Sequence, residues 1–324
     1  MATRRMVLAA PRSFCAGVAR AVKIVEKAVE TYGTPVYVRR QVVHNTHVME
    51  RLAARGAVVV QELSEVPPGA TVVFAAHGVS PAVREEAKSR GLRVIDATCP
   101  MVAKVHGEAR LFAEMGFQIL LIGEAGHDEV VGTTGEAPEC ITLVEGPDAV
   151  DDLCVADPGR LVWLSQTTLS VDETMQTVGR LRQRFPALLD PPSGDICFAT
   201  QNRQSAVKLI APASEVVIVV GSRNSSNSVR LAEVARHAGA GSAHQVEDAS
   251  ELDLSWLEGV HTVGVAAGAS VPPSVVAGVV DALRGLGFPE PTEERFTVET
   301  MVFDLPAELA GALPRSRSTN RSTM

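Results

Sequence analysis

One pattern recurs three times along the chain and restricts the possible folds more than any other feature. Each occurrence begins with a short β-rich run that ends in a small polar turn, continues through a helical stretch, and closes with a second β-rich run and a second polar turn. The six β-rich runs cover residues 35–38, 70–76, 118–122, 160–164, 216–220 and 262–266. Short apolar runs that alternate with helical stretches are typical of parallel α/β sheets.

The six polar turns predict where a ligand binds. Ligands of such folds lie beyond the carboxyl ends of the strands, which is where all six turns fall. The turns of a pair are 33, 40 and 43 residues apart, measured from His44 to His77, His127 to Thr167 and Asn227 to Ser270. Any α/β protein has polar turns after its strands, so one pair alone indicates little. Three pairs in the same phase favour three related α/β lobes.

Length and composition agree with this interpretation. We expect a first lobe at 1–97, including an N-terminal strand and Cys15, a second at 98–194 and a third at 195–290, then a C-terminal extension at 291–313 and a disordered tail at 314–324. Aromatic residues are only 4% of the 324 residues, so the core must be built from smaller aliphatic side chains.

Net charge, hydropathy and cysteine content indicate which binding partners and which cellular compartment to expect. The formal net charge of −8 argues against general nucleic-acid binding. No apolar run approaches the ~20 residues of a membrane span. The apolar stretch near the N-terminus is too short for the hydrophobic region of a signal peptide. Five cysteines, an odd number, predict reduced thiols in a cytoplasmic protein.

Three of the cysteines stand where a strand or loop gives way to a helical stretch. Cys15 precedes an amphipathic pattern, Cys99 precedes Pro100, and Cys197 precedes a stretch that becomes helical by Gln201. Thiolates are the ligand form of cysteine, and the positive end of a helix dipole stabilises them. Taken singly, each could be a buried, inert cysteine. One cysteine per lobe indicates instead three ligands of one iron–sulfur cluster, a pattern that Cys140 and Cys154 do not share.

Nine segments, in order, resemble the motifs of the 4-hydroxy-3-methylbut-2-enyl diphosphate reductases, the last enzymes of the non-mevalonate isoprenoid pathway. The segments are PRSFCAGV (11–18), VHN (43–45), AHGVSP (76–81), DATCP (96–100), GHDEV (126–130), SQTTLS (165–170), DIC (195–197), GSRNSSN (221–227) and AGAS (267–270). The departures are small. Ala10 and Ser13 stand where the family more often has Asn and Gly, and Val271 varies.

The resemblance implies three α/β lobes around a central cavity, together with a cofactor and a reaction. The family holds one 4Fe-4S cluster by three cysteines, which fall on Cys15, Cys99 and Cys197, and the iron without a protein ligand can accept the substrate's hydroxyl oxygen. The reaction is reductive dehydroxylation, in which two electrons and two protons yield isopentenyl diphosphate, dimethylallyl diphosphate and water. The expected electron donor is ferredoxin or flavodoxin, while the sequence leaves the oligomeric state open.

Other residues of these motifs suit proton transfer and diphosphate binding. Glu129 is the candidate proton donor and Thr167 the candidate hydroxyl relay, because a dehydrated site can keep a carboxylic acid protonated. Imidazolium groups and neutral donors can bind phosphate oxygens. The candidate substrate-binding residues are His44, His77, His127, Thr168, Ser225, Ser226, Asn227 and Ser270. His106, His237, His244 and His261 fit ordinary core or surface positions.

Two other functions would also use such a cluster and remain as alternatives. A cluster-bearing hydro-lyase also uses three cysteines and an open iron but performs no net reduction. A redox sensor or electron carrier would use the cluster alone and would have no need of three turn histidines and Glu129. Dependence of product formation on a reductant distinguishes the two enzymes.

Overall fold

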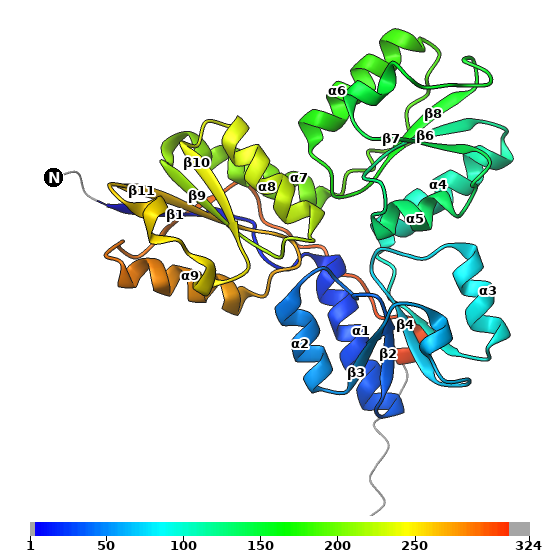
Figure 1. Cartoon of the computed structure of the whole chain (residues 1–324), viewed down its shortest axis with the longest axis horizontal. Helices are drawn as coiled ribbons and strands as arrows, with labels where there is room; N and C mark the ends of the chain where they lie inside the picture. The colour runs from blue at the N-terminus through cyan, green and yellow to red at the C-terminus, as the bar shows by residue number, and fades with distance from the viewer. Residues whose placement is uncertain (1–3, 311–324) are drawn as a thin grey trace, which may run out of the picture.

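The protein is built from three parallel β-sheets, each flanked by helices. The computed structural model describes residues 4–310. Figure 1 shows the three sheets as separate lobes around a common centre. The pairings among the described strands are parallel, which confirms the α/β fold predicted from the sequence.

The first lobe has a four-stranded sheet in the order β3-β2-β4-β5. Its elements are α1 (Ala16–Tyr32), β2 (Val36–Arg39), α2 (Thr46–Ala54), β3 (Ala57–Val60), β4 (Thr71–Phe74), α3 (Pro81–Ser89) and β5 (Arg93–Asp96). The apolar stripe of α1 packs on the sheet with Val22 and Val25 only 4% and 0% exposed. Each such valine contributes about 1.5 kcal/mol by leaving water, so this stripe anchors the helix that follows Cys15.

The second lobe has a three-stranded sheet in the order β7-β6-β8. Its elements are α4 (Pro100–Glu114), β6 (Gln118–Ile122), α5 (Asp128–Thr134), β7 (Ile141–Val144), β8 (Leu161–Ser165) and α6 (Val171–Arg184). The predicted lobe boundaries, 97/98 and 194/195, fall in the connections before α4 and after α6. Pro100 opens α4 directly after Cys99, as its position in the sequence predicts.

The third lobe has a five-stranded sheet in the order β10-β9-β11-β1-β12. Its elements are β1 (Arg5–Ala10), α7 (Phe198–Ile210), β9 (Val216–Val220), α8 (Ser226–His237), β10 (Ser242–Val246), β11 (Thr262–Ala267), α9 (Pro273–Gly285) and β12 (Thr292–Arg295). Short 3-10 helices lie in the connections of the three lobes: η1 (Leu63–Glu65), η2 (Pro147–Val150), η3 (Ala211–Ala213), η4 (Ala249–Glu251) and η5 (Leu254–Leu257).

The N-terminal strand corrects the predicted first lobe. We expected it in that lobe because it precedes Cys15, but β1 pairs with β11 and β12 in the third sheet, with Leu8 opposite Val265 and Glu293. The strand is buried from Met6 to Ala10, as a central parallel strand must be. Which sheet a strand joins depends on long-range pairing, and nearness in sequence does not report that.

The predicted C-terminal extension continues the third sheet and then returns to the first lobe. After β12, the Asp304 carbonyl accepts a hydrogen bond from Arg20 Nε at 2.7 Å. The chain then forms α10 (Ala307–Ala310), and Leu309 is buried against the core beneath α1. The tail predicted to be disordered, 314–324, lies outside the described residues.

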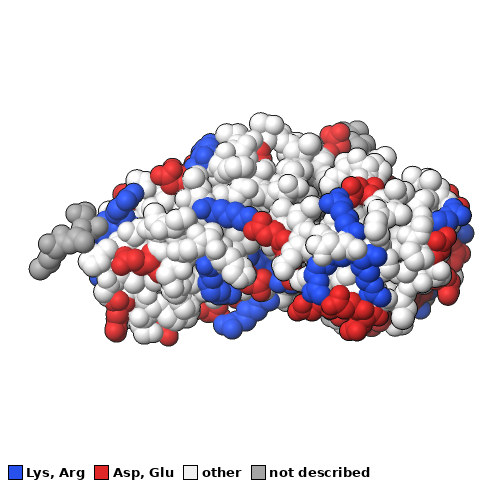
Figure 2. All heavy atoms as spheres, turned by 90° about the horizontal axis from the view of Figure 1, so that it is seen from above, with Lys and Arg blue, Asp and Glu red and all other residues white. Residues whose placement is uncertain are grey.

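The distribution of surface charge and the hydropathy of the helices can be compared with the expectations about nucleic-acid binding and membrane spans. In the view from above, Lys and Arg side chains lie next to Asp and Glu side chains rather than forming one basic surface (Figure 2). Among residues 4–310, no helix is both long enough and apolar enough to cross a bilayer.

Candidate functional site

A cavity lies where the three lobes meet, with about 700 Å³ of empty space including its mouth. The turns that follow β4, β6, β8, β9 and β11 reach it, as expected for ligand sites beyond the carboxyl ends of parallel strands. The structure brings together in its lining all the site residues predicted from the sequence: Cys15, His44, His77, Cys99, His127, Glu129, Thr167, Thr168, Cys197, Ser225, Ser226, Asn227 and Ser270.

The three cysteines form one end of the cavity, here called the sulfur end. Cys15, Cys99 and Cys197 are the N-cap residues of α1, α4 and α7, one from each lobe. Amide groups of the first helical turn point at the sulfur atoms, and the Val18 amide donates to Cys15 Sγ at 3.4 Å. This confirms the predicted helix starts, including α7, which begins at Phe198 and is helical by Gln201.

A glycine allows two of the sulfurs to approach one backbone. A Cβ atom at Gly17 would lie 2.7 Å from Cys99 Sγ and 3.8 Å from Cys15 Sγ. Because carbon and sulfur cannot pack at the shorter distance, a side chain there would push the two cysteines apart. The three soft sulfur donors, aimed from helix starts into one cavity, fit an iron–sulfur cluster. Cys140 and Cys154 are not among the cavity-lining residues.

Burial shifts the pKa values of two of these thiols, Cys99 and Cys197, more strongly than the helix starts do. It raises the pKa of Cys99 to about 11 and that of Cys197 to about 12, and the neighbouring thiols add to both shifts. Helix amides lower both pKa values, which is the effect expected from the sequence, but the lowering is the smaller effect. A metal centre must therefore displace the thiol protons when it binds.

Glu129 and Thr167 form a buried hydrogen-bonded pair in the middle of the cavity lining. Glu129 is 1% exposed, and its two carboxyl oxygens accept hydrogen bonds from the amide and the hydroxyl group of Thr167, at 2.7 and 3.0 Å. Burial raises the pKa of Glu129 to about 7, although both hydrogen bonds act to lower it. A carboxyl group with this pKa can hold a proton and release it near neutral pH.

Three histidines form a second group in the lining, here called the histidine end. The rings of His44 and His77 stack with centroids 4.0 Å apart, and the His127 ring meets them edge-on at 5.5 and 5.8 Å. Burial lowers the pKa of His44 to about 4 and lowers those of His77 and His127 as well. Burial thus favours neutral imidazoles in the ligand-free cavity, because a charged ring would lose its hydration, and charge-assisted binding of a phosphate by these rings stays a prediction.

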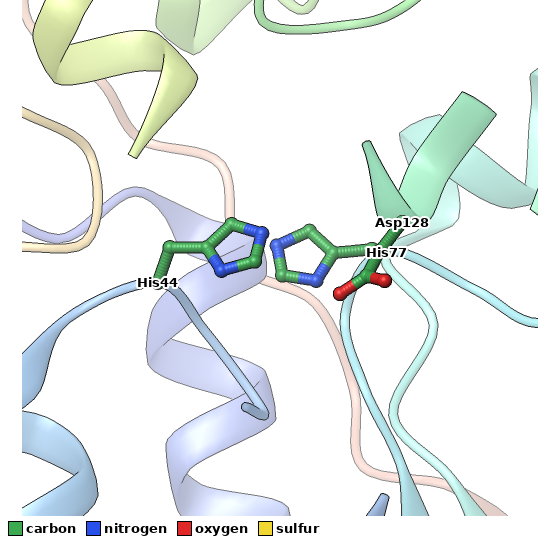
Figure 3. A group of neighbouring side chains, drawn as sticks. All are labelled: His44, His77 and Asp128. Carbon is green, nitrogen blue, oxygen red and sulfur yellow. The ribbon is translucent and has the colours of Figure 1, made fainter. Parts of the chain in front are cut away.

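Asp128 lies beside the histidine end without lining the cavity, and the sequence analysis missed it. One ligand atom from each of His44, His77 and Asp128 lies within 4.8 Å of the others (Figure 3). The two stacked rings are nearly parallel, however, so their ring-nitrogen lone pairs lie in nearly parallel planes and do not converge on one point. In addition, Arg40 forms an ion pair with Asp128. The arrangement suits an anion held by ring N–H groups better than a cation shared by two stacked imidazoles.

The third lobe contributes neutral donors from the start of α8 and the turn after β11. The Asn227 Oδ1 atom accepts the Ala269 amide at 2.9 Å, which leaves its buried Nδ2 group without a protein partner. The Ser270 hydroxyl donates to the His44 carbonyl at 2.9 Å and so joins the third lobe to the first. Helix α8 begins at Ser226, so its first turn belongs to the site.

Two further polar residues of the site were not predicted. Gln166 is 1% exposed, and its amide donates to the hydroxyl groups of Thr168 and Ser226 at 2.8 and 3.3 Å, across two lobes. Thr200 lines the cavity one helical turn after Cys197. The three-residue spacing from Cys197 could have identified Thr200, whereas nothing local distinguishes Gln166 from its neighbours.

The backbone conformation near Cys15 shows why the family more often has glycine at the position of Ser13. Ser13 has a φ of +64°, a conformation that suits the glycine more common there. Its carbonyl accepts hydrogen bonds from the buried Arg203 guanidinium at 2.7 and 3.2 Å. Arg203 extends from α7, so this contact also links the helix of Cys197 to the loop of Cys15.

Comparison with known proteins adds an independent observation. The family model described as "LytB protein" matches residues 6–284. The 4-hydroxy-3-methylbut-2-enyl diphosphate reductase of Acidothermus cellulolyticus is 62% identical over 306 residues, covering 94% of this chain and 90% of that protein. The 4-hydroxy-3-methylbut-2-enyl diphosphate reductase 2 of Mycobacterium tuberculosis is 60% identical over 306 residues, covering 94% and 91%.

Solved structures also match. The E-1-hydroxy-2-methyl-but-2-enyl-4-diphosphate reductase from Plasmodium falciparum superposes with a TM-score of 0.91 at 35% identity, covering 95% of this chain and 97% of that one. A second structure, described as the terminal enzyme of the non-mevalonate pathway, gives a TM-score of 0.61 at 30% identity, covering 87% and 100%. The likeness therefore extends to the arrangement of all three lobes.

Proposed function

Because this chain belongs to the LytB protein family, we propose that it performs the reaction for which its relatives are named, the reduction of 4-hydroxy-3-methylbut-2-enyl diphosphate. The substrate loses its hydroxyl group as water, and two electrons and two protons convert it to isopentenyl diphosphate and dimethylallyl diphosphate. One proton leaves with the oxygen, and the other joins the carbon skeleton.

One observation carries the proposal. A single cavity contains three thiols at helix starts, a buried carboxyl–hydroxyl pair and a group of neutral hydrogen-bond donors. Each lobe contributes one of the thiols. An electron carrier would need only the thiols, so the other residues favour an enzyme.

Cys15, Cys99 and Cys197 would hold one 4Fe-4S cluster at the sulfur end. When bound, the cluster supplies electrons and, at the iron without a protein ligand, a Lewis acid for the substrate's hydroxyl group. The chain's own contribution at this end is orientation, because each sulfur is fixed by a helix N-terminus, and close approach, because Gly17 lacks a side chain.

Glu129 would supply the proton for the departing hydroxyl group. Its carboxyl group is neutral below about pH 7, and the Thr167 hydroxyl group, 3.0 Å away, can pass a proton between it and the substrate. Burial excludes water from this pair, so a proton released there goes to the substrate rather than to solvent.

The histidine end and the third-lobe donors would bind the diphosphate. Neutral imidazole N–H groups, the free Asn227 amide and the serine hydroxyl groups can each donate to a phosphate oxygen. With a net charge of −8, the protein as a whole repels an anion. Binding must therefore come from this local set of donors.

The electrons must come from outside the chain, and we propose a small electron-transfer protein such as ferredoxin or flavodoxin as the donor. Chemical reductants can replace it in a test. We expect the anaerobically reconstituted protein to form both products from the substrate when dithionite and a viologen mediator are present, and none when they are left out. Product formation at the same rate without reductant would contradict the proposal and favour a hydro-lyase.

A further inference from the structure

His106 was set aside in the sequence analysis as an ordinary histidine, but its surroundings are unusual. It lies on α4 and is 3% exposed. Its Nδ1 atom is 2.7 Å from a carboxyl oxygen of Glu136, and the other oxygen of that carboxyl group is 2.8 Å from the Arg110 guanidinium. The side chain of Glu136 is 3% exposed. The imidazole is thus held at one nitrogen by a buried carboxylate that is itself paired.

The opposite side of the ring fills a narrow gap between two backbones. A Cβ atom at Gly78 would lie 2.9 Å from His106 Nε2, and one at Gly132 would lie 3.1 Å from His106 Cε1. Gly78 directly follows His77, while Gly132 is on α5, the helix that carries Glu129 and has His127 as its N-cap. The imidazole therefore separates the turn of the first lobe from the helix of the second.

The polarity of His106 is not explained by packing. Its Nε2 atom is buried without a hydrogen-bond partner, and such an atom destabilises the fold relative to an apolar group of similar shape. The bond from Nδ1 to Glu136 gives a reason for an imidazole here, because it fixes the orientation of the ring in the gap. A leucine could fill the same space but could not be fixed in this way.

We propose that His106 is a positioning residue that sets the separation of His77 from His127 and thereby the geometry of the diphosphate site. This inference rests on the proposed function, in which those two histidines bind the diphosphate. Their ring centroids lie 5.8 Å apart, one on each side of the gap that His106 fills.

The effect should fall on substrate binding rather than on the chemical step. The Nδ1 atom of His77 has no protein partner, so the place of this ring depends on its stacking and on the turn that His106 supports. Glu129 is held independently by two hydrogen bonds from Thr167. Loosening the gap should therefore move His77 more than it moves Glu129.

The test uses His106→Asn in the cluster-loaded enzyme. Asparagine keeps a donor near the Nδ1 position for Glu136 but lacks the ring atoms that lie between the two glycines. We expect KM and the inhibition constant of inorganic pyrophosphate to rise by about tenfold or more while kcat stays within about threefold. Iron and sulfide content should not change. His244→Asn, which removes a ring stacked on Trp256 in the third lobe, is the matched control.

A second variant approaches the gap from the other side. Gly132→Ala places a methyl group against the His106 ring without removing it, so it should also raise KM and the pyrophosphate inhibition constant. If either variant folds, loads its cluster and keeps the wild-type KM, the inference is wrong. If wild-type enzyme does not turn over substrate with reductant, or pyrophosphate does not inhibit it, the proposed function fails, and this inference fails with it.

Discussion

Burial favours the neutral form of cysteines at the sulfur end and of histidines at the histidine end, but it does so by shifting their pKa values in opposite directions. At the sulfur end it raises the pKa of Cys99 and Cys197, so the thiols keep their protons. At the histidine end it lowers the pKa of His44 and His77, so the rings release theirs. Charge must therefore enter with the ligands. Cluster assembly releases protons, whereas an anion at the histidines favours proton uptake.

The two ends also differ in what holds their side chains. Each thiol is the N-cap of a helix, so the backbone of that helix sets its position. Among the histidines, the Nδ1 atoms of His44 and His77 have no protein partner. The sulfur end is therefore organised before a ligand arrives, while the histidine end leaves hydrogen-bonding groups free for one.

The largest effect should come from removing a thiol. Cys197→Ser should abolish the cluster, because a hard, weakly acidic hydroxyl group is a poor ligand for iron in this site. Iron and sulfide counts with the visible spectrum measure this. Pyrophosphate binding to the cluster-free variant should persist if the two ends are independent.

Cys140→Ser is the matched control and should load a full cluster, because Cys140 does not line the cavity. A cluster retained by Cys197→Ser would remove this cysteine from the ligand set. Loss of pyrophosphate binding together with the cluster would show that the two ends form one unit.

The next largest effect is expected from a substitution of Glu129, whose carboxyl group lines the cavity. Glu129→Gln should keep the cluster and lower kcat by about 10²–10⁴-fold, as expected for loss of a positioned acid. Glu139→Gln, an exposed carboxyl group of the same lobe, should be neutral. Substantial turnover by Glu129→Gln would place the proton donor elsewhere.

The pH dependence of kcat should report the same carboxyl group. Burial raises the pKa of Glu129 from its ordinary 4.5 to about 7, and the protonated form is the donor. The rate should thus be highest below about pH 7 and fall as the pH rises through that value. A rate that rises across pH 6–8 would be opposite in sign to this assignment.

A smaller effect concerns protons taken up at the histidine end. Because the pKa of His44 is about 4 in the empty cavity, a bound anion that raises it adds a fraction of a proton near pH 6. Titration calorimetry of pyrophosphate binding in buffers of different ionisation enthalpy counts these protons. His44→Asn should take up fewer than the wild type, and equal uptake would mean that His44 does not sense the anion.

The smallest effect is expected at the loop before Cys15. Ser13→Gly should stabilise the cluster-free protein by about 0.5–1 kcal/mol, because glycine adopts a φ of +64° without the contact between Cβ and the backbone. Ser89→Gly, at the end of α3, is the control and should destabilise. Denaturant unfolding measures both, and a destabilised Ser13→Gly would mean that the Ser13 side chain contributes more than its backbone costs.

Much of the site could be predicted because its residues follow local rules. The β-rich runs became strands β2, β4, β6, β8, β9 and β11, each within about two residues. The cysteines stand at helix starts because strand-to-helix connections are short and have recognisable composition. Asp128 and Gln166 escaped notice, and His106 was set aside, because their importance depends on partners in other segments: Arg40, Ser226 and Gly78.

The sequence by itself determined the parallel α/β units, the polar turns at the strand ends and the three cysteines before helices, because period, turn chemistry and helix starts are local properties. Only the tertiary structure decided that β1 joins the third sheet, that Gly17 lets two sulfurs approach, and that burial favours neutral forms of cavity-lining cysteines and histidines such as Cys99 and His44. These features depend on long-range pairing and on burial. Both arise only when segments far apart in the chain come together.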